Sequence, residues 1–198
     1  MTIVVGITGG IGSGKSVLSN YLKKSGYCVH DSDEEVSLIY KKPTQKFKKI
    51  LIQVGLKKAI KKKHIDKKII IKKFFTDIKI KKTLEKHLHL EVKKKRSLFI
   101  KKQRAKKTKV VFLDIPLLFE NNLDNLFNKT ICIISLRTKR QKRIEKSKKI
   151  SKKIFSEVTK HQTSDRERKK RADYLITNNG TKKNFIKSAD RVIKDILK

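Results

Sequence analysis

A short apolar run followed by a glycine-rich loop is the feature that most constrains how this chain folds. The run begins at Ile3 and leads into the segment Gly9-Gly10-Ile11-Gly12-Ser13-Gly14-Lys15-Ser16. This segment matches the phosphate-loop pattern of Gly, any four residues, Gly, Lys and then Ser or Thr. Apolar residues follow it at helical spacing from Val17 to Leu22, so the loop is expected to join a strand to a helix. That context predicts an α/β fold that binds a nucleoside triphosphate.

The residue types of this loop suit phosphate binding. Glycines allow successive backbone N–H groups to turn inward toward phosphate oxygens. The helix expected from about Lys15 directs its unsatisfied N–H groups at the same oxygens. Lys15 is long enough to reach the β- and γ-phosphates, and the Ser16 hydroxyl is a candidate ligand for Mg²⁺. We therefore expect Mg²⁺ to be the required cofactor.

Five apolar runs predict the strands of a parallel sheet. They are nearly continuous in hydrophobicity, as expected for strands that are covered on both faces. The runs are Ile3 to Thr8, Tyr27 to His30, Val110 to Leu113, Thr130 to Ser135 and Tyr174 to Ile176. Helical segments between them, at about 15–25, 84–105, 138–147 and 182–197, predict a doubly wound parallel sheet of the P-loop NTPase and nucleotide-kinase type. Ligands are then expected at the carboxyl ends of the strands.

The chain of 198 residues is expected to form a single domain with one long insertion. Its core is expected to comprise residues 1–34, 109–137 and 172–198. Residues 35–108 are polar and rich in lysine, and they form either a helical subdomain for the second substrate or a poorly ordered surface segment. The fold of residues 41–80 stays open. Arginines, rare elsewhere, concentrate in a second charged stretch at about 138–171, as Arg137, Arg140, Arg143, Arg166, Arg168 and Arg171.

The charge and the cysteines limit the partners and the compartment. The formal net charge is +36, from 54 Lys and Arg residues against 18 Asp and Glu residues. Because the lysines are spread through nearly every segment, we expect nonspecific polyanion binding but no specific nucleic-acid partner. Cys28 and Cys132 lie in apolar runs and are expected to be buried, reduced thiols. The first residues enter a core strand and no apolar run is long enough to span a membrane, so we expect a cytoplasmic protein. We also expect it to be a monomer.

A phosphate loop alone does not distinguish a kinase from a GTPase or a motor ATPase. The guanine-reading motif Asn-Lys-x-Asp is not formed at 128–131, where the sequence is Asn-Lys-Thr-Ile. A small-molecule kinase fits best, and it needs a carboxylate that orients the acceptor hydroxyl. Asp31 and Asp33 follow the second predicted strand and would project to the same side of an extended segment. We expect one of them to orient the hydroxyl and take its proton while the other organises Mg²⁺-bound water; the alternative is that one of the two caps the next helix. Arginines near 140 and 168 are expected to neutralise the transferring phosphoryl group.

Three motifs and their order resemble the dephospho-CoA kinase family. The first is the loop from Gly6 to Ser16, the second is Asp31-Ser32-Asp33, and the third is Asp114-Ile115-Pro116-Leu117-Leu118-Phe119-Glu120. Further elements are similar in order and spacing, namely Gln162, Arg168, Ala172-Asp173-Tyr174 and Asn178-Asn179-Gly180. The similarity extends over nearly the whole chain and is weakest at 41–80.

The resemblance implies transfer of the γ-phosphate of ATP to the ribose 3′-hydroxyl of dephospho-CoA, the last step of coenzyme A synthesis. It also implies a nucleotide-binding core, a helical substrate domain within 35–108 and a mobile lid at about 138–171. ATP is then expected to contact Gly10, Ile11, Gly12, Ser13, Gly14, Lys15, Ser16 and Val17, with Asn178 and Gly180 near the adenine.

The resemblance also implies roles for residues at the acceptor. Asp33 is the favoured hydroxyl-orienting base, with Asp31 beside it, and Arg143 and Arg168 reach the phosphates from the lid side. The residues expected near dephospho-CoA are Asp33, His89, Leu117, Leu118 and Glu120.

Three positions depart from the family pattern. Val17 stands where a second hydroxyl residue is usual, Leu90 replaces a proline, and Ser147 replaces a second lid arginine. Lys146 or Lys148 would supply a point charge there without forked geometry. These departures predict a slower enzyme rather than a different one. The alternatives are another small-molecule kinase, acting on nucleosides or nucleotides, a basic nucleic-acid-associated ATPase, and a relic that binds ATP without transferring phosphate.

Overall fold

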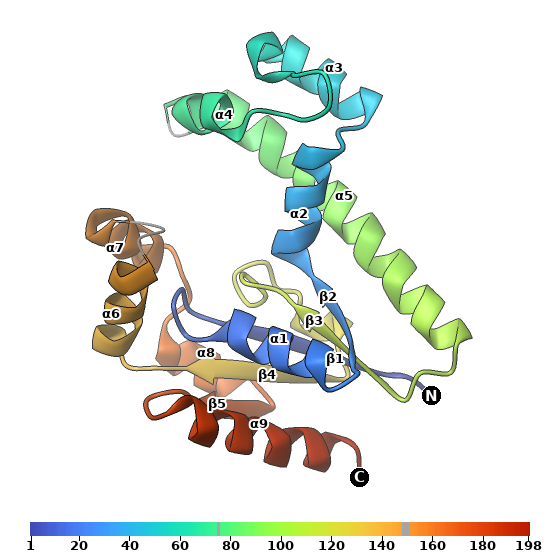
Figure 1. Cartoon of the computed structure of the whole chain (residues 1–198), viewed down its shortest axis with the longest axis vertical. Coiled ribbons are helices and arrows are strands. Elements are labelled where there is room, and N and C mark those ends of the chain that lie inside the picture. The colour runs from blue at the N-terminus through green and yellow to red at the C-terminus, as the bar shows by residue number, and fades with distance from the viewer. Residues whose placement is uncertain (75, 148–150) are drawn as a thin grey trace. The chain divides into compact units, whose positions relative to one another are not determined.

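The computed structural model describes residues 1–74, 76–147 and 151–198. These residues form two compact units (Figure 1). The first unit, the nucleotide unit, comprises Met1–Asp31 and Ile100–Lys198, and the second, the helical unit, comprises Ser32–Phe99. The helical unit begins and ends somewhat earlier in the sequence than the insertion expected at 35–108.

The nucleotide unit contains a five-stranded sheet in which every neighbouring pair of strands is parallel. The strand order is β2-β3-β1-β4-β5. The strands are β1 (Ile3–Gly9), β2 (Cys28–Asp31), β3 (Val110–Asp114), β4 (Lys129–Ile134) and β5 (Tyr174–Thr177). Because the order reverses beside β1, the loop after β1 lies at the switch point where ligands bind in such sheets. The predicted doubly wound parallel sheet is confirmed.

Helices connect the strands of the nucleotide unit. They are α1 (Lys15–Lys24), α6 (Arg137–Ser147), α7 (Lys152–Lys160), α8 (Asp165–Arg171) and α9 (Lys182–Ile196), with a short 3₁₀ helix η2 (Asp124–Leu126). Three of these helices have a hydroxyl residue as their N-terminal cap. The side chains of Ser151, Ser164 and Thr181 each accept a hydrogen bond from the backbone N–H three residues later. Such caps satisfy one of the amide groups that a helix leaves without an internal partner.

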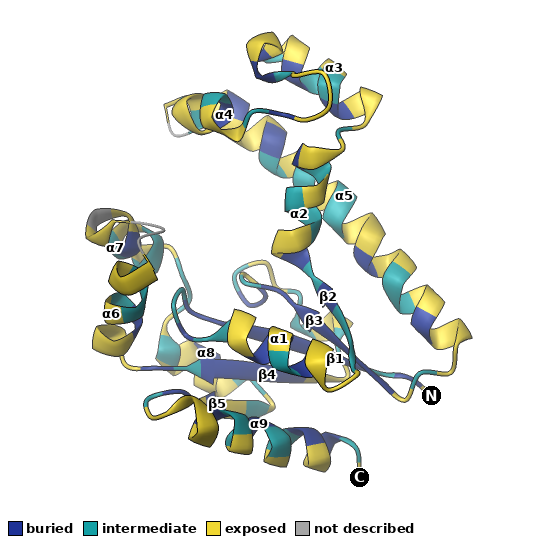
Figure 2. Cartoon of the chain, viewed as in Figure 1, coloured by how far each residue is buried: buried dark blue, intermediate teal, exposed yellow. Residues whose placement is uncertain are grey.

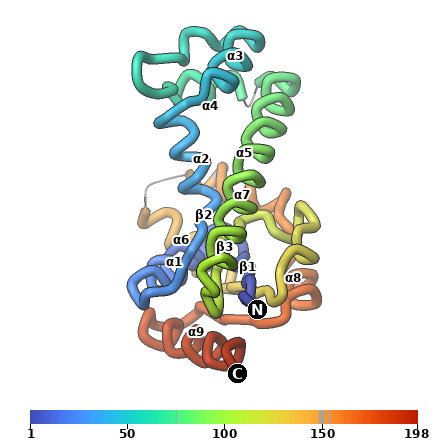
Figure 3. The backbone as a smooth tube through the Cα atoms, turned by 90° about the vertical axis from the view of Figure 1, so that its right-hand side faces the viewer, coloured from blue at the N-terminus to red at the C-terminus, as the bar shows by residue number. Residues whose placement is uncertain are grey.

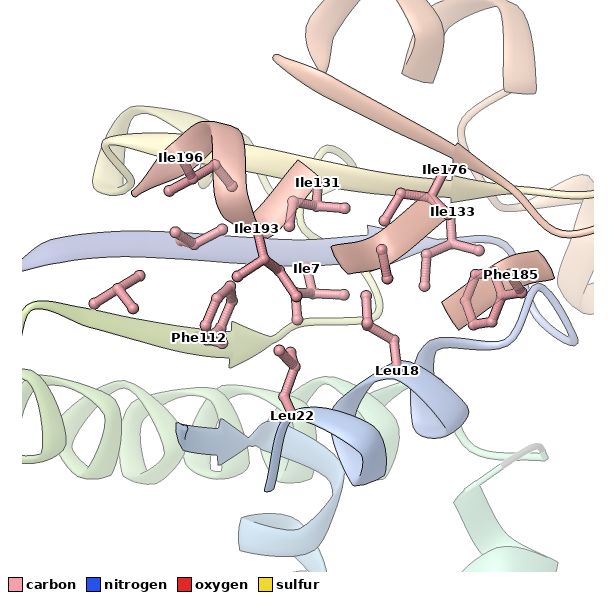
Figure 4. Close-up of a cluster of buried hydrophobic side chains, with 13 residues drawn as sticks. Ile7, Leu18, Leu22, Phe112, Ile131, Ile133, Ile176, Phe185, Ile193 and Ile196 are labelled. Atoms are coloured by element: carbon pink, nitrogen blue, oxygen red, sulfur yellow. The ribbon is translucent and has the colours of Figure 1, made fainter. Parts of the chain in front are cut away.

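Helices α1 and α9 cover one face of the sheet, and the apolar core of the nucleotide unit lies between these helices and the sheet (Figure 4). Ile7 of β1, Leu18 of α1 and Phe112 of β3 are fully buried there, and Ile193 of α9 is nearly so. Alternation along β1 directs Gly6 to the opposite face, where an added Cβ would lie 2.7 Å from Leu118 Cδ1. A larger residue at this position would therefore force the Leu118 side chain to shift, because the segment after β3 packs directly on the strand.

The helical unit consists of helices and their connections, followed from α2 to α5 in Figure 3. Its elements are α2 (Ser32–Lys41), α3 (Gln45–Gln53), the 3₁₀ helix η1 (Lys57–Ala59), α4 (Lys67–Phe74) and most of α5 (Ile78–Ala105). Buried and exposed positions alternate along these helices (Figure 2), and many of the exposed positions are lysines. The apolar cluster centres on Phe47, Leu51 and Leu84, which are fully buried.

The predicted extended segment at Asp31-Ser32-Asp33 is wrong. Strand β2 ends at Asp31, and α2 begins at Ser32, so the side chains of Asp31 and Asp33 do not project from one extended segment. Asp33, Glu34 and Glu35 occupy the first turn of α2. Negative charge there is stabilised by the positive end of the helix dipole, which favours helix at this point.

Two further features of the sequence can be followed in the described residues. Cys132 is buried in β4, and burial raises the pKa of its thiol to about 11, so it stays protonated. Cys28 is only half-buried, in contrast to the buried position expected for it.

Among the helices of the described ranges, none combines the length and hydrophobicity needed to cross a membrane.

Candidate active site

The loop between β1 and α1 adopts a conformation that depends on glycine. Gly14, which precedes the first residue of α1, has a φ of 115°, in the left-handed region that other residues rarely adopt. A Cβ at Gly14 would also collide with the side-chain nitrogen of Asn178. The loop therefore turns sharply into α1, which begins directly after β1 and this turn. The first N–H groups of a helix have no partner within it, and such groups are suited to phosphate oxygens.

Lys15 and Ser16 begin α1 directly after this turn. Lys15 Nζ donates a hydrogen bond to the Gly9 carbonyl oxygen at 2.8 Å, so its ammonium group lies across the phosphate loop. Ser16 is exposed in the first turn. One turn later, Ser19 Oγ donates to Asp114 Oδ2 at 2.6 Å, which ties α1 to the end of β3.

The residues present fit a Mg²⁺ ion that is bound mainly through a nucleotide. No group of three or more His, Cys, Asp or Glu side chains within the described ranges could hold a metal ion. Ser16 offers an exposed hydroxyl oxygen beside Lys15. Mg²⁺ prefers oxygen ligands and commonly keeps waters and substrate phosphates in its coordination shell. A single hydroxyl together with phosphate oxygens and waters is therefore an adequate ligand set.

Arg143 links the phosphate loop to the carboxyl ends of β4 and β5. Its Nη1 donates to the Gly12 carbonyl oxygen at 3.2 Å and to Ser135 Oγ at 3.1 Å. Its Nη2 donates to the Asn178 carbonyl oxygen at 2.6 Å. Asn178, which is buried, also donates from Nδ2 to the Ser13 carbonyl oxygen at 2.7 Å. The two residues thus hold the loop through its carbonyl groups.

Two further arginines are buried against Gly10 of the loop. A Cβ at Gly10 would clash with Arg140 Nη1 and lie 3.1 Å from Arg168 Nη1. Arg168 Nη2 donates to Glu120 Oε1 at 2.9 Å, and Arg168 Nη1 donates to Asp165 Oδ1 at 3.1 Å. Burial lowers the pKa of the Arg140 guanidinium, although the neighbouring Asp165 opposes this effect. The carboxylates therefore balance two desolvated cations beside the phosphate loop.

The connection between α7 and α8 also contacts the loop. Gln162 Oε1 accepts a hydrogen bond from the Ile11 backbone N–H at 3.0 Å. In the next residue, the Thr163 N–H donates to Glu120 Oε1 at 2.8 Å. These contacts fix the chain on either side of the buried arginines, so that the loop, the segment after β3 and the start of α8 form one polar network.

The sequence-predicted site residues are distributed over both units. The nucleotide unit brings Lys15, Ser16, Arg143, Arg168, Asn178 and Glu120 into the connected region described above. In the segment after β3, Leu117 is 41% exposed, whereas Leu118 is fully buried in the core. Asp31 is half-buried at the end of β2, and Gly180 is exposed after β5. In the helical unit, Asp33 is exposed on α2 and His89 is exposed on α5. Lys148 lies outside the described residues.

Sequence reasoning missed Asp165 and gave Gln162 no role. The signal for Asp165 is present in the sequence, because Ser164 and Glu167 form the Ser-x-x-Glu pattern of a helix start. Asp165 and Arg168 then fall three residues apart on one helix, a spacing at which opposite charges meet. The contact of Gln162 with Ile11 joins residues 151 positions apart and has no local signal.

Comparisons with known proteins agree with this geometry. A model of the dephospho-CoA kinase family matches residues 3–184. The dephospho-CoA kinase of Fusobacterium nucleatum is 34% identical over 195 residues, covering 98% of this chain and 98% of that protein. The structure of dephospho-CoA kinase from Campylobacter jejuni is similar with a TM-score of 0.74 at 29% identity, covering 99% of this chain and 98% of that chain.

A more distant structure shows the fold alone. The shikimate kinase from Acinetobacter baumannii, solved in complex with shikimate, has a TM-score of 0.53 at 12% identity, covering 100% of this chain and 97% of that chain.

A crystal structure from Thermus thermophilus, TT1252, is more similar, with a TM-score of 0.79 at 26% identity, covering 98% of this chain and 97% of that chain. The family model matches residues 3–184, and the Fusobacterium nucleatum relative aligns over 98% of both chains. The chain therefore belongs to the dephospho-CoA kinase family.

Proposed function

We propose that this chain carries out the reaction of its family with ATP on the phosphate loop and with Asp33 orienting the acceptor. The family activity is ATP-dependent phosphorylation of the ribose 3′-hydroxyl of dephospho-CoA, which gives coenzyme A. The supporting observation is that a complete phosphate loop is surrounded by three arginines, Arg140, Arg143 and Arg168. The alternatives, a nucleoside or nucleotide kinase and a nucleic-acid-associated ATPase, are not favoured.

The nucleotide residues follow from the loop and its neighbours. The backbone from Gly10 to Val17 receives the phosphates of ATP, with N–H groups of the loop and of the first turn of α1 as donors. Lys15 exchanges its hydrogen bond to the Gly9 carbonyl oxygen for the β- and γ-phosphates. Asn178 and Gly180, at the end of β5, lie toward the adenine end of the nucleotide.

Mg²⁺ is proposed to be held by the Ser16 hydroxyl together with phosphate oxygens and water. When bound, it neutralises charge on the β- and γ-phosphates. Ser16 is suited to this role because it is exposed next to Lys15, so that the hydroxyl and the ammonium group can contact the same phosphates.

The arginines stabilise the charge of the transferring phosphoryl group. Phosphoryl transfer passes through a loose transition state with charge spread over three oxygens, so positioned cations contribute more than covalent chemistry. Arg168 lies against Gly10 and is held by Glu120 and Asp165, so its direction is fixed before substrate binds. Arg143 supports the loop from the other side through its contacts with carbonyl groups.

The acceptor residues are proposed from their place in the sequence and from their exposure. Asp33, exposed in the first turn of α2, orients the 3′-hydroxyl and takes its proton, with Asp31 two residues earlier. Leu117 and Glu120 contact the acceptor from the segment after β3, where Leu118 supports them from the core. His89 is the acceptor contact proposed on α5.

We propose that the chain acts as a cytoplasmic monomer without a specific nucleic-acid partner. Its net charge of +36 attracts polyanions without sequence preference, and such binding weakens steeply with salt. Salt dependence therefore separates this attraction from the binding of ATP and dephospho-CoA.

The proposed function is tested by measuring ADP release from Mg-ATP with and without dephospho-CoA. We expect dephospho-CoA to stimulate ADP release, and the product to be coenzyme A phosphorylated at the 3′ position, as determined by mass and fragmentation. The Lys15→Ala variant is expected to lose the stimulation. ATP binding without stimulation by dephospho-CoA, together with turnover on a nucleoside or on RNA, would contradict the proposal.

A further inference from the structure

Asp165 contacts both of the arginines that lie against Gly10 of the phosphate loop. Its Oδ2 accepts a hydrogen bond from Arg140 Nη2 at 3.4 Å, and its Oδ1 accepts one from Arg168 Nη1 at 3.1 Å. Two guanidinium ions that share one location repel each other, and burial removes the water that would screen them. A carboxylate that contacts both groups offsets this repulsion and fixes the direction of each.

Arg140 depends on Asp165 more than Arg168 does. Arg168 has a second carboxylate partner in Glu120 at 2.9 Å, whereas in the described part of the chain Asp165 is the acidic partner of Arg140. Only 6% of the Arg140 side chain is exposed, and its Nε has no hydrogen-bond partner among the described residues. Its contact with Asp165, together with its packing against Gly10, therefore restrains the direction of the guanidinium plane.

The position of Asp165 is itself determined by the local sequence. Ser164 precedes α8 and accepts a hydrogen bond from the Glu167 N–H through its side chain, which sets where the helix begins. Asp165 is thus the first residue of α8, where negative charge is favoured, and Arg168 follows three residues later on the same face. Arg140 comes from α6, so the carboxylate joins two helices beside the loop.

We propose that Asp165 is a positioning residue for phosphoryl transfer, which holds Arg140 and Arg168 in the geometry that the transferring phosphoryl group requires. The inference rests on the proposed role of these arginines at the phosphates. Because a carboxylate repels phosphate, Asp165 contributes to the rate through orientation and not through affinity for ATP. Its loss should therefore lower kcat without raising the KM for ATP.

The test compares Asp165→Asn with Glu167→Gln. Each substitution removes one negative charge from the first turn of α8, but Glu167 is exposed and only Asp165 contacts the two arginines. We expect Asp165→Asn to lower kcat roughly tenfold, within the range of coupling in one ion-pair network, with an unchanged or lower KM for ATP. We expect Glu167→Gln to match the unmodified chain in both constants.

A second pair of variants separates positioning from a general loss of structure. In an Arg140→Met background, Asp165→Asn should lower kcat much less than in the unmodified chain, because the arginine that has Asp165 as its acidic partner is gone, while Arg168 keeps its second carboxylate, Glu120. Asp165→Glu keeps the carboxylate and should retain part of kcat, and it replaces Asp165→Asn in the comparison if circular dichroism shows that the Asn variant does not fold. An equal kcat loss in Glu167→Gln, or the same loss from Asp165→Asn in the Arg140→Met background as in the unmodified chain, would overturn the inference.

The outcomes also distinguish this inference from the proposed function. An unmodified chain without dephospho-CoA-dependent turnover would overturn the proposed function and the inference with it. An active chain whose Asp165→Asn variant keeps its kcat, or shows only a raised KM for ATP, would overturn the inference alone.

Discussion

Each of the two units of this molecule contains an apolar cluster, but the units differ in the polar contacts that accompany it. In the nucleotide unit, hydrogen bonds join side chains and backbone groups that are far apart in sequence, such as Ser19 with Asp114 at 2.6 Å and Asn178 with Ser13 at 2.7 Å. The helical unit centres on an apolar cluster in which Phe47 stacks on His87 with ring centroids 4.9 Å apart. Polar contacts such as Lys67 to Ser37, at 3.4 Å, lie on its surface.

This difference indicates how each unit responds to substitution. A hydrogen-bond network fixes the directions of its members, so a change of one atom at constant volume can displace a functional group. An apolar cluster has no directional contacts of this kind, and it responds chiefly to the volume that is removed or added. Polar substitutions in the nucleotide unit should therefore change kcat or KM. Substitutions that change the volume of a buried side chain in the helical unit should change the stability of that unit.

The largest effect is expected for Lys15→Ala. This variant removes the ammonium group that contacts the loop. Because we propose that the same group contacts the phosphates of ATP, kcat/KM should fall about 1000-fold or more. Lys24→Ala, at the exposed end of the same helix, is the matched control and should keep full turnover. The measurement is dephospho-CoA-dependent ADP release, and unchanged turnover in Lys15→Ala would refute catalysis on the phosphate loop.

Asp33→Asn tests whether the helical unit supplies a group that takes part in phosphoryl transfer. The substitution keeps the size of the side chain but removes the carboxylate that we propose as the proton acceptor, so kcat should fall roughly 100-fold or more while ATP binds as before. Glu34→Gln removes the same charge from the same first turn of α2 and should have little effect. Calorimetric titration with ATP accompanies the kinetics, since a parallel loss of ATP binding would make Asp33 a structural or metal-binding residue.

Phe47→Leu is expected to affect stability and not the chemical step. Phe47 is fully buried and packs on the rings of Tyr40 and His87, so the loss of volume and of ring contacts should cost about 2 kcal/mol. Ile52→Ala, on the same helix α3 at a position that is 50% exposed, should cost much less.

Hydrogen exchange measured by mass spectrometry locates this effect. Faster exchange in the peptides of the helical unit, with the strands of the nucleotide unit unchanged, would support the comparison. Equal acceleration in β1 and β4 would show that the two units do not respond separately to a loss of volume.

The strands and the phosphate loop could be predicted because their determinants are local in sequence. The run from Val110 to Leu113 is apolar throughout, and the structure places β3 at Val110–Asp114. The bounds of α2 were harder, because Ser32 and Asp33 suit both the end of a strand and the start of a helix. Residues 41–80 gave little signal, since lysines occupy much of the surface of α3 and α4 and only a few apolar residues mark their buried sides.

The polar network of the site could not be predicted, because it depends on segments that only the fold brings together. Arg140 and Asp165 are 25 positions apart, and Arg168 and Glu120 are 48 positions apart. The sequence shows arginines concentrated in this stretch, but it does not distinguish the buried Arg140 and Arg168 from the exposed Arg166. That distinction depends on which side of α6 and α8 faces the loop.

The smallest expected effect is a loss of stability when the pH is lowered, and it arises in the helical unit. Burial lowers the pKa of His87, with Lys46 and Lys94 acting in the same direction and Glu91 opposing them. Because the unfolded chain binds this proton more readily than the folded chain, protonation favours unfolding, and stability falls as the pH drops below about 6.5. We expect this loss to be smaller than the cost of Phe47→Leu.

Denaturant titrations of the His87→Gln variant between pH 5 and pH 8 test this expectation. His87→Gln removes the titrating group and should flatten the pH dependence of the free energy of unfolding, even if the variant is less stable at every pH. His64→Gln, at an exposed position, should leave the pH dependence as it is. A slope between pH 5 and pH 7 that persists unchanged in His87→Gln would assign the acid response to other groups and remove His87 from the account of the helical unit.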